Sequence, residues 1–181
     1  AWRFASTSSL TTLTVVTGEW RGVLYPAALP SFHRLPAPEP LADLVRWFWI
    51  PEWDIEPGRS ARQDVIAFPA SNLVVEPDLV GLAGPTTRRS FRDLSGRGWA
   101  VGALLRPAAV PSFTDDPAAL RDAYRTMDLP ELHAAVTAAM AGDDPEARRA
   151  GAVAAYCAWL IANIPTPDEP AQLANAMADL I

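Results

Sequence analysis

Acidic side chains at the end of an aromatic run are the first candidates for chemistry. Glu52, Asp54 and Glu56 surround Trp53, and closely spaced carboxylates can act as general acids and bases. The run leads directly into a turn over residues 56–59, however, where acidic side chains are usually hydrated. We therefore predict no catalytic residue, and we expect that the chain is not an enzyme.

The two histidines and the single cysteine are not spaced as metal ligands or as a nucleophile and its base. His33 falls in a proline-rich segment and His133 on an expected surface helix, whereas metal sites need several ligands close together. Cys157 lies on the apolar stripe of a predicted helix, where we expect a buried, inert thiol. The sequence contains no Gly-x-Ser-x-Gly elbow and no glycine-rich phosphate loop. We predict neither a metal nor another cofactor.

Aromatic and charged side chains of the central region predict a pocket for a small molecule. An apolar pocket with a few polar groups is the usual form of such a site. The aromatic candidates are Trp47, Trp49, Trp53, Phe68 and Trp99, and the polar candidates are Arg46, Arg62, Asp64 and Glu76. The alternative is that the tryptophans fill a small core.

Charge limits the partners that this chain can bind by itself. The 181 residues carry a net charge of −6, and all 15 basic residues are arginine. The local basic run Arg88, Arg89, Arg92 and Arg97 fits either an anion or acidic partner, or a solvated hairpin. Because proteins that grip nucleic acid are normally basic, we expect no direct DNA contact from this chain.

The sequence also bears on the cellular compartment. No stretch reaches the roughly 20 apolar residues of a membrane span, and the N-terminal segment lacks the basic start and apolar run of a secretory signal. A single cysteine excludes an internal disulfide and fits a reducing compartment. We therefore expect a cytoplasmic protein that does not contact a membrane.

The elements that must position the candidate residues are organised around residues 96–107. Alternation in this segment places Trp99, Val101, Ala103 and Leu105 on one face of a strand and small residues on the other, so that another element or a ligand can approach closely. The segment 88–94 is expected to pair with 98–105. The other predicted strands cover residues 21–26, 46–53, 62–69, 72–77 and 80–85, and residues 26–40 form a connecting loop.

Helical patterns follow this sheet-forming region. Helices are predicted to begin at residues 116–117, at a capping box over 128–131, at 144–145 and at 168, and the third of them ends near residue 163. The fold class is therefore α+β, with a cupin-like or sandwich-like antiparallel β-sheet followed by a C-terminal helical region. Residues 1–19 would form an N-terminal arm, 20–110 a β-rich sensing domain and 111–181 the helical region.

The apolar stripes of the last two helices have two interpretations. They could pack on a second copy of the chain, which would make a homodimer, or they could be buried in the core. The dimerisation candidates are Val153, Tyr156, Cys157, Leu160, Leu173, Met177 and Leu180. The final pattern stops within a helix, so we expect further chain after it.

Four short segments, in their order and spacing, carry a family resemblance. They are Leu41–Trp49, Phe68–Val75, Gly84-Pro85 and Gly102–Pro107. Together they resemble the N-terminal sensing region of AraC-family transcriptional regulators over residues 20–180. The resemblance implies a β-rich domain, a helical linker and a C-terminal pair of helix-turn-helix motifs, of which the last is absent from this chain.

The resemblance implies that the chain is the regulatory domain of a bacterial DNA-binding transcription regulator. It would sense a small-molecule effector, form a homodimer, or do both, and it would contact DNA only through the missing C-terminal domain. Two alternatives remain open. One is a stand-alone cupin-like small-molecule enzyme or ligand-binding protein, and the other is a dimerisation module without a ligand.

Overall fold

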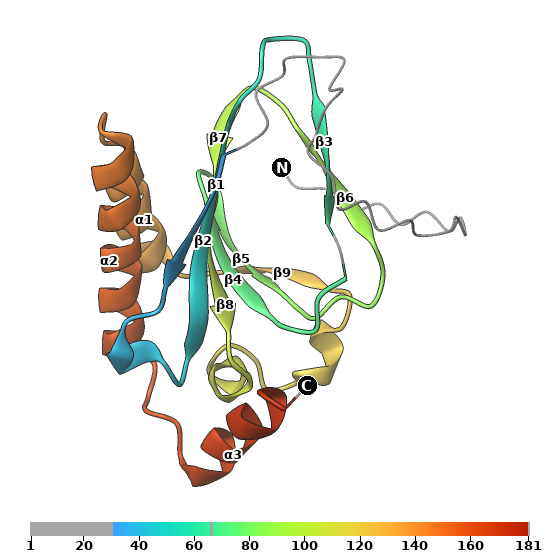
Figure 1. Ribbon diagram of the computed structural model, residues 1–181, viewed down its shortest axis with the longest axis vertical. Helices are drawn as coiled ribbons and strands as arrows, with labels where there is room; N and C mark the ends of the chain where they lie inside the picture. The colour runs from blue at the N-terminus through green and yellow to red at the C-terminus, as the bar shows by residue number, and fades with distance from the viewer. Residues whose placement is uncertain (1–30, 66, 181) are drawn as a thin grey trace.

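The computed structural model describes residues 31–65 and 67–180, and strands within these ranges form two antiparallel sheets (Figure 1). The larger sheet has the order β1-β2-β8-β4-β5-β9, and β7 also pairs with β2. Its strands are β1 (Ser31–Pro36), β2 (Val45–Asp54), β4 (Asn72–Glu76), β5 (Leu79–Ala83), β7 (Arg97–Trp99), β8 (Val101–Leu105) and β9 (Tyr124–Met127). The smaller sheet is a ribbon of β3 (Ala61–Val65) and β6 (Ser90–Leu94).

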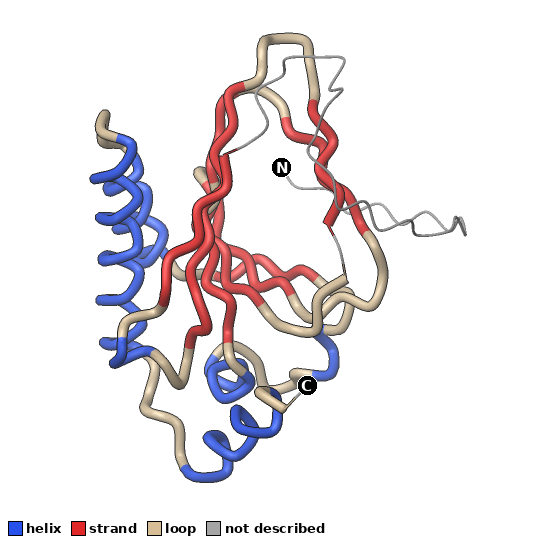
Figure 2. Tube along the Cα trace, viewed as in Figure 1, coloured by secondary structure: helices blue, strands red, loops and turns tan. Residues whose placement is uncertain are grey.

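Helices follow and cover this sheet on one side. The α-helices are α1 (Pro130–Met140), α2 (Pro145–Asn163) and α3 (Glu169–Ala178), and the 3-10 turns are η1 (Glu39–Leu41), η2 (Pro107–Ser112) and η3 (Ala118–Leu120). Helices α1 and α2 lie together along one face of the larger sheet, and the β3–β6 ribbon lies on the opposite side (Figures 1 and 2). This arrangement confirms the α+β, sandwich-like fold class. No helix among the described residues has the length and apolarity to cross a membrane.

The main core lies between the larger sheet and helices α1 and α2. Alternation along the strands turns Phe48, Leu73 and Ala103 toward the helices, where they are completely buried. Tyr156 of α2 is also buried; its ring packs edge-on against Phe48, with ring centroids 5.4 Å apart, and its hydroxyl donates a hydrogen bond of 2.8 Å to the carbonyl oxygen of Leu73. Val153, Cys157 and Leu160 are buried in the same layer. The apolar stripe of α2 is therefore buried in the core of the same chain, which is the second of the two interpretations given for it.

Three of the four predicted helix starts are confirmed, since α1 begins within 128–131, α2 at Pro145 and α3 at Glu169, whereas only the short turn η3 follows 116–117. The Asp144 side chain accepts a hydrogen bond from the Glu146 N–H at 3.2 Å at the start of α2, and Asp168 accepts one from the Ala171 N–H at 3.0 Å at the start of α3. Helix α1 instead has Leu129 at its N-cap position without any side-chain cap, so the predicted capping box over 128–131 does not form.

Three predictions about strands are wrong for identifiable reasons. Residues 31–36 were expected in a loop, but their extended backbone pairs with β2 along its outer edge. A short helix was expected from residues 116–117 through Tyr124, but only the short turn η3 forms, and Asp122, with a φ of 55°, turns the chain into β9. The segment 88–94 pairs with β3 because β8 already has β2 and β4 as its two neighbours. The predicted N-terminal arm and the strand over 21–26 lie outside the described residues.

Glycine at position 102 allows an aromatic ring to lie directly on β8. A Cβ atom built on Gly102 would come within 2.1 Å of the Trp49 ring, far inside van der Waals contact. The indole cannot move away freely, because its Nε1 donates a hydrogen bond of 2.9 Å to Asn72 and Phe32 stacks on it. Gly102 is thus required by packing.

We expect Gly102→Ala to destabilise the domain by about 1–3 kcal/mol, the usual range for overpacking a fitted interior. Gly151→Ala is the matched control, since its nearest neighbour would be the Ala139 Cβ at 3.7 Å and alanine favours the helix. Urea unfolding of the two variants measures the difference. Equal stability of both variants would contradict this assignment.

Candidate functional site

The face of the larger sheet that points away from α1 and α2, called here the inner face, carries two of the five aromatic candidates. Trp47 and Trp49 lie on it because Phe48 between them points into the core. Glycines make room for the flat rings: the Trp49 ring covers Gly102 and the Tyr124 ring covers Gly81. Gly102, one of the small residues predicted on one face of β8, is therefore covered by an indole.

Two rings on the inner face are held in place by further contacts. Trp49 donates its indole N–H to the Asn72 side chain and stacks on Phe32, with ring centroids 6.3 Å apart and planes 9° from parallel. Trp47 lies beneath two guanidinium groups, those of Arg34 at 4.4 Å and Arg46 at 5.8 Å from the ring centroid. Both rings are therefore fixed in place on the inner face by contacts with other side chains.

A buried polar cluster links the inner face to the ribbon, and we call Glu76, Arg92 and Tyr124 the inner cluster. The Tyr124 hydroxyl donates a hydrogen bond of 3.1 Å to Glu76 Oε1, and Arg92 Nη1 lies 3.9 Å from the same oxygen. The Arg92 guanidinium also lies 5.9 Å from the centroid of the Tyr124 ring. Glu76 is only 2% exposed, so the cluster joins β4 and β9 of the larger sheet to β6 in the interior.

Burial shifts the pKa of all three groups. It raises the pKa of Glu76 from its ordinary value of 4.5 to about 7, although the Arg92 charge and the Tyr124 hydrogen bond act in the opposite direction. Burial also lowers the pKa of Arg92 to about 10, partly offset by Glu76. The pKa of Tyr124 is raised by burial and by Glu76. At neutral pH the Glu76 carboxyl therefore exists in both protonation states and can either donate or accept a hydrogen bond.

Several predicted binding residues lie away from the inner cluster. Arg62 and Asp64 occupy the opposite face of the ribbon from Arg92, because alternate residues of a strand point in opposite directions. There Arg62 makes two hydrogen bonds to Asp93, of 2.9 and 3.1 Å, and Asp64 pairs with Arg89 at 2.8 Å. The prediction that Arg62 and Asp64 share one pocket with Glu76 is therefore wrong.

The remaining aromatic candidates are dispersed. Trp99 packs against the main core and so lies on the helix side of the sheet. Trp53 covers Gly98 and donates a 3.4 Å hydrogen bond to the Ser95 carbonyl near the turn that precedes β7. Phe68 is 43% exposed in a loop. Of the five aromatic candidates, the structure brings Trp47 and Trp49 together on the inner face.

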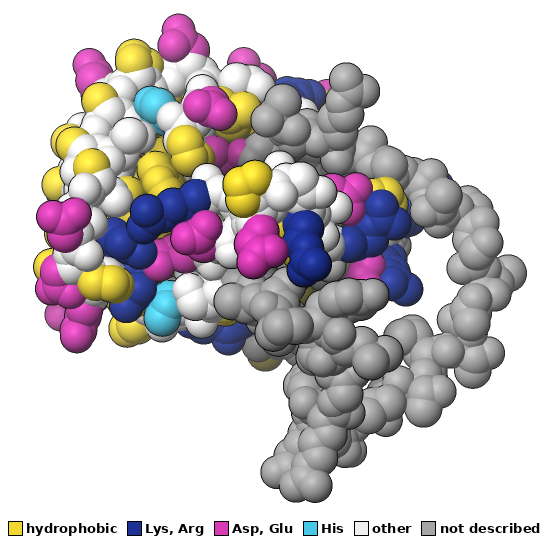
Figure 3. Space-filling model, turned by 90° about the horizontal axis from the view of Figure 1, so that it is seen from above, with side chains coloured by type: hydrophobic (Ala, Val, Ile, Leu, Met, Phe, Trp, Pro, Cys, Tyr) yellow, Lys and Arg dark blue, Asp and Glu magenta, His cyan; other side chains and the backbone are white. Residues whose placement is uncertain are grey.

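The four arginines of the basic run do not form one patch. Arg89 pairs with an acidic neighbour on the outer face of the ribbon, whereas Arg92 points inward to Glu76. In the space-filling view, arginine and acidic side chains lie next to one another over the described part of the face (Figure 3). Such mixing favours solvation over binding of a polyanion.

The acidic cluster near Trp53 has a structural role at one position. Glu52 accepts hydrogen bonds from Arg148 at 2.8 Å and from Arg149 at 3.4 Å, which tie β2 to α2. Asp54 and Glu56 are exposed, as expected for hydrated side chains. Within the described residues, no group of three or more His, Cys, Asp or Glu side chains gathers as metal ligands do.

Sequence reasoning missed Asn72 and Tyr124 as inner-face residues. Tyr124 was assigned to a helix, so its alternation within β9 was not considered. Gly81 was a usable signal, since glycine inside a strand often marks the close approach of another group. Arg92 was assigned to a basic run, although its position two residues before the buried Leu94 places both on one face of β6.

The fold and this cluster define an α+β domain with a sandwich-like antiparallel sheet and a buried, titratable inner face. A family model described as a domain of unknown function (DUF6597) matches residues 33–124, half of the chain. The chain belongs to this family. The match runs from β1 to Tyr124 and so includes the inner cluster and both inner-face tryptophans. No curated protein and no solved structure matches the chain.

We expect the stability of the domain to depend on Glu76 between pH 4.5 and about 7. Because the folded state holds the Glu76 proton to a higher pH than the unfolded state, the contribution of the protonated carboxyl is complete below pH 4.5. This contribution is then lost as the pH rises to about 7, for a total of about 3 kcal/mol. Urea unfolding of the wild type and Glu76→Gln at several pH values measures this loss.

Glu76→Gln keeps the oxygen that accepts from Tyr124 but cannot ionise, so its stability should fall less over this range than that of the wild type. Glu131→Gln, at an exposed position of α1, is the control and should follow the wild type. Parallel curves for the wild type and Glu76→Gln would contradict the protonation of Glu76 in the folded state.

Proposed function

We propose that this domain is the effector-sensing and dimerisation part of a bacterial transcription regulator of the AraC type. A small molecule would bind at the inner face, a homodimer would form through α3, and a C-terminal helix-turn-helix domain would contact DNA. Binding of the effector must differ in strength between two arrangements of the dimer, because otherwise no signal passes between the sites. We expect the protein to act in the cytoplasm.

The observation that carries the proposal is the orientation of α3. Leu173, Met177 and Leu180 lie on one side of this segment and are 61%, 60% and 88% exposed. The side chain of this helix that is fully buried is polar Asn175. An apolar stripe that faces solvent is the usual mark of a contact surface. A second copy of the chain offers the same stripe and can cover it in a symmetric contact.

The inner face supports the sensing part of the proposal. The Trp49 indole, stacked on Phe32, and a carboxyl that changes protonation near neutral pH can select a small ligand by shape and by one or two hydrogen bonds. The acidic net charge of −6 and the mixed surface charge favour leaving DNA contact to another domain.

A second candidate function is an enzyme that acts on a small molecule at the same face. One observation favours it: Glu76, with its pKa raised to about 7, accepts a hydrogen bond from Tyr124, and such a carboxyl is suited to donate or remove a proton. A sensor returns its ligand unchanged, whereas an enzyme converts it.

The first experiment is a thermal-shift screen of the chain against small metabolites. A ligand at 100 times its dissociation constant adds about 2.7 kcal/mol of stability, which raises the melting temperature by a few degrees. We expect Trp49→Leu to abolish the shift of any true ligand and Trp53→Leu, distant on β2, to retain it. Mass spectrometry of the ligand after incubation separates the two candidates, since a chemically altered ligand would overturn the sensor proposal.

A second prediction concerns the dimer. The double variant Leu173→Glu, Met177→Glu should convert a dimer to a monomer in light scattering while its melting temperature stays close to that of the wild type, because both side chains are exposed. Ile161→Glu, on the 56% exposed Ile161 of α2, is the control and should remain dimeric. A wild-type chain that is monomeric at all concentrations would contradict dimerisation through α3.

A further inference from the structure

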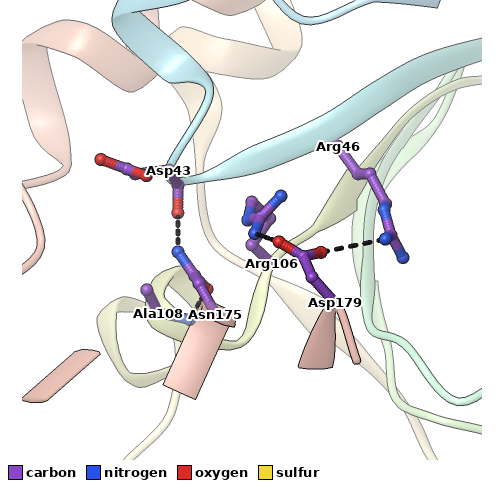
Figure 4. Close-up of polar contacts among 6 residues, drawn as sticks. All are labelled: Asp43, Arg46, Arg106, Ala108, Asn175 and Asp179. Carbon is purple, nitrogen blue, oxygen red and sulfur yellow. Dashed lines mark hydrogen bonds and ion pairs between the residues drawn. The ribbon is translucent and has the colours of Figure 1, made fainter. Parts of the chain in front are cut away.

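Helix α3 is held to the rest of the domain by polar contacts (Figure 4). The Asn175 side chain donates a hydrogen bond of 2.8 Å to the Asp43 carbonyl and accepts one of 3.0 Å from the Ala108 N–H. The Asp179 carboxylate pairs with Arg46 at 3.0 Å and also with Arg106. We call these contacts of Asn175 and Asp179 the α3 latch.

Little apolar packing supports the latch. The residues of α3 that face the domain around Asn175 are Ala171 and Ala178, which are small and half-buried, while the large apolar side chains point to solvent. The Arg46 and Asp179 side chains are 45% and 43% exposed, and ion pairs at such positions contribute little to stability. Water can replace each latch contact when α3 leaves the domain, so the free energy that favours the docked state is small.

The position of Asp179 is not explained by the helix itself. Asp179 is the C-cap residue of α3, and a carboxylate there is repelled by the negative end of the helix dipole. Two arginines compensate for this repulsion, Arg46 of β2 and Arg106 directly after β8, so Asp179 benefits the docking of α3 and not the helix itself. The partners Arg46 and Arg106 stand at the adjoining ends of β2 and β8, the strands that carry Trp49 and Gly102 on the inner face.

One side chain of the latch also contacts the inner face. The pairing of β2 with β8 shifts register between Val45 and Trp47, and such a bulge re-aims the residue within it, here Arg46. The Arg46 guanidinium lies 5.8 Å from the centroid of the Trp47 ring and 3.0 Å from Asp179. Trp47 therefore helps to position the arginine that holds α3.

We propose that α3 is a releasable element, docked by the α3 latch, and that Trp47 couples the state of the inner face to this docking through Arg46. That this coupling carries a signal rests on the proposed function. In that case, an effector at the inner face alters the docking of α3, the dimerisation helix, through Trp47 and Arg46. A ligand that contacts Trp47 changes the position of Arg46 and so the fraction of molecules with α3 docked.

Hydrogen exchange of α3 amides tests the latch without any ligand. We expect Asp179→Asn to speed exchange in residues 172–179 by about two- to fivefold, the range that an exposed ion pair gives, and Asp179→Glu to restore part of the protection. Asp93→Asn is the matched control, because it removes a different arginine–carboxylate pair, with Arg62 on the ribbon, and should leave α3 unchanged. Added salt should speed exchange in the wild type more than in Asp179→Asn.

Trp47→Leu tests the coupling. It should raise α3 exchange in the same direction as Asp179→Asn, whereas Trp53→Leu at the other end of β2 should not. Unchanged α3 exchange in both Asp179→Asn and Trp47→Leu overturns the proposal, whatever the oligomeric state. Faster exchange in these two variants supports the latch even if no effector or dimer is found, in which case only the proposed function fails.

Discussion

The central position of β8 is the constraint on which the rest of the structure depends. Both edges of this strand are paired, so its side chains can leave the sheet only above or below it. The side chains on one side pack in the main core beneath α1 and α2; they are Val101, Ala103 and Leu105. Gly102 on the other side admits the Trp49 ring, and the end of the strand passes directly into the Arg106 that holds α3. Core, inner face and docking site thus meet on one short strand.

The parts of this architecture that depend on local pattern could be predicted from the sequence. Alternation identified β8, β4 and β5, and Asp144 and Asp168 identified the starts of two helices, because burial of one face and capping act between near neighbours. The strand β9 was missed because Asp116 and Pro117 form an N-cap and first-turn pair, and the spacing of Leu120 and Tyr124 fits one face of a helix. The strand β1 was missed because prolines surround it.

The inner cluster could be predicted only in part. Glu76 was a candidate, but its contact with Arg92 joins two different sheets and depends on how the ribbon folds over, which no local pattern encodes. The same is true of the four α2 candidates, whose stripe fits a core and a dimer interface equally well until the sheet beneath it is known. Helix α3 had the same kind of pattern, but its apolar stripe is exposed, because its polar Asn175 side chain points inward.

The exposure of the α3 stripe has a chemical consequence as well as a structural one. Met177 stands in the middle of the stripe between Leu173 and Leu180, and its thioether is open to oxidants. Conversion to the sulfoxide would place a polar, chiral group at the centre of the apolar surface, and reductases can reverse that change. Preparations of this protein that have aged in air would then lose whatever association the stripe supports, and reduction of the sulfoxide would restore it.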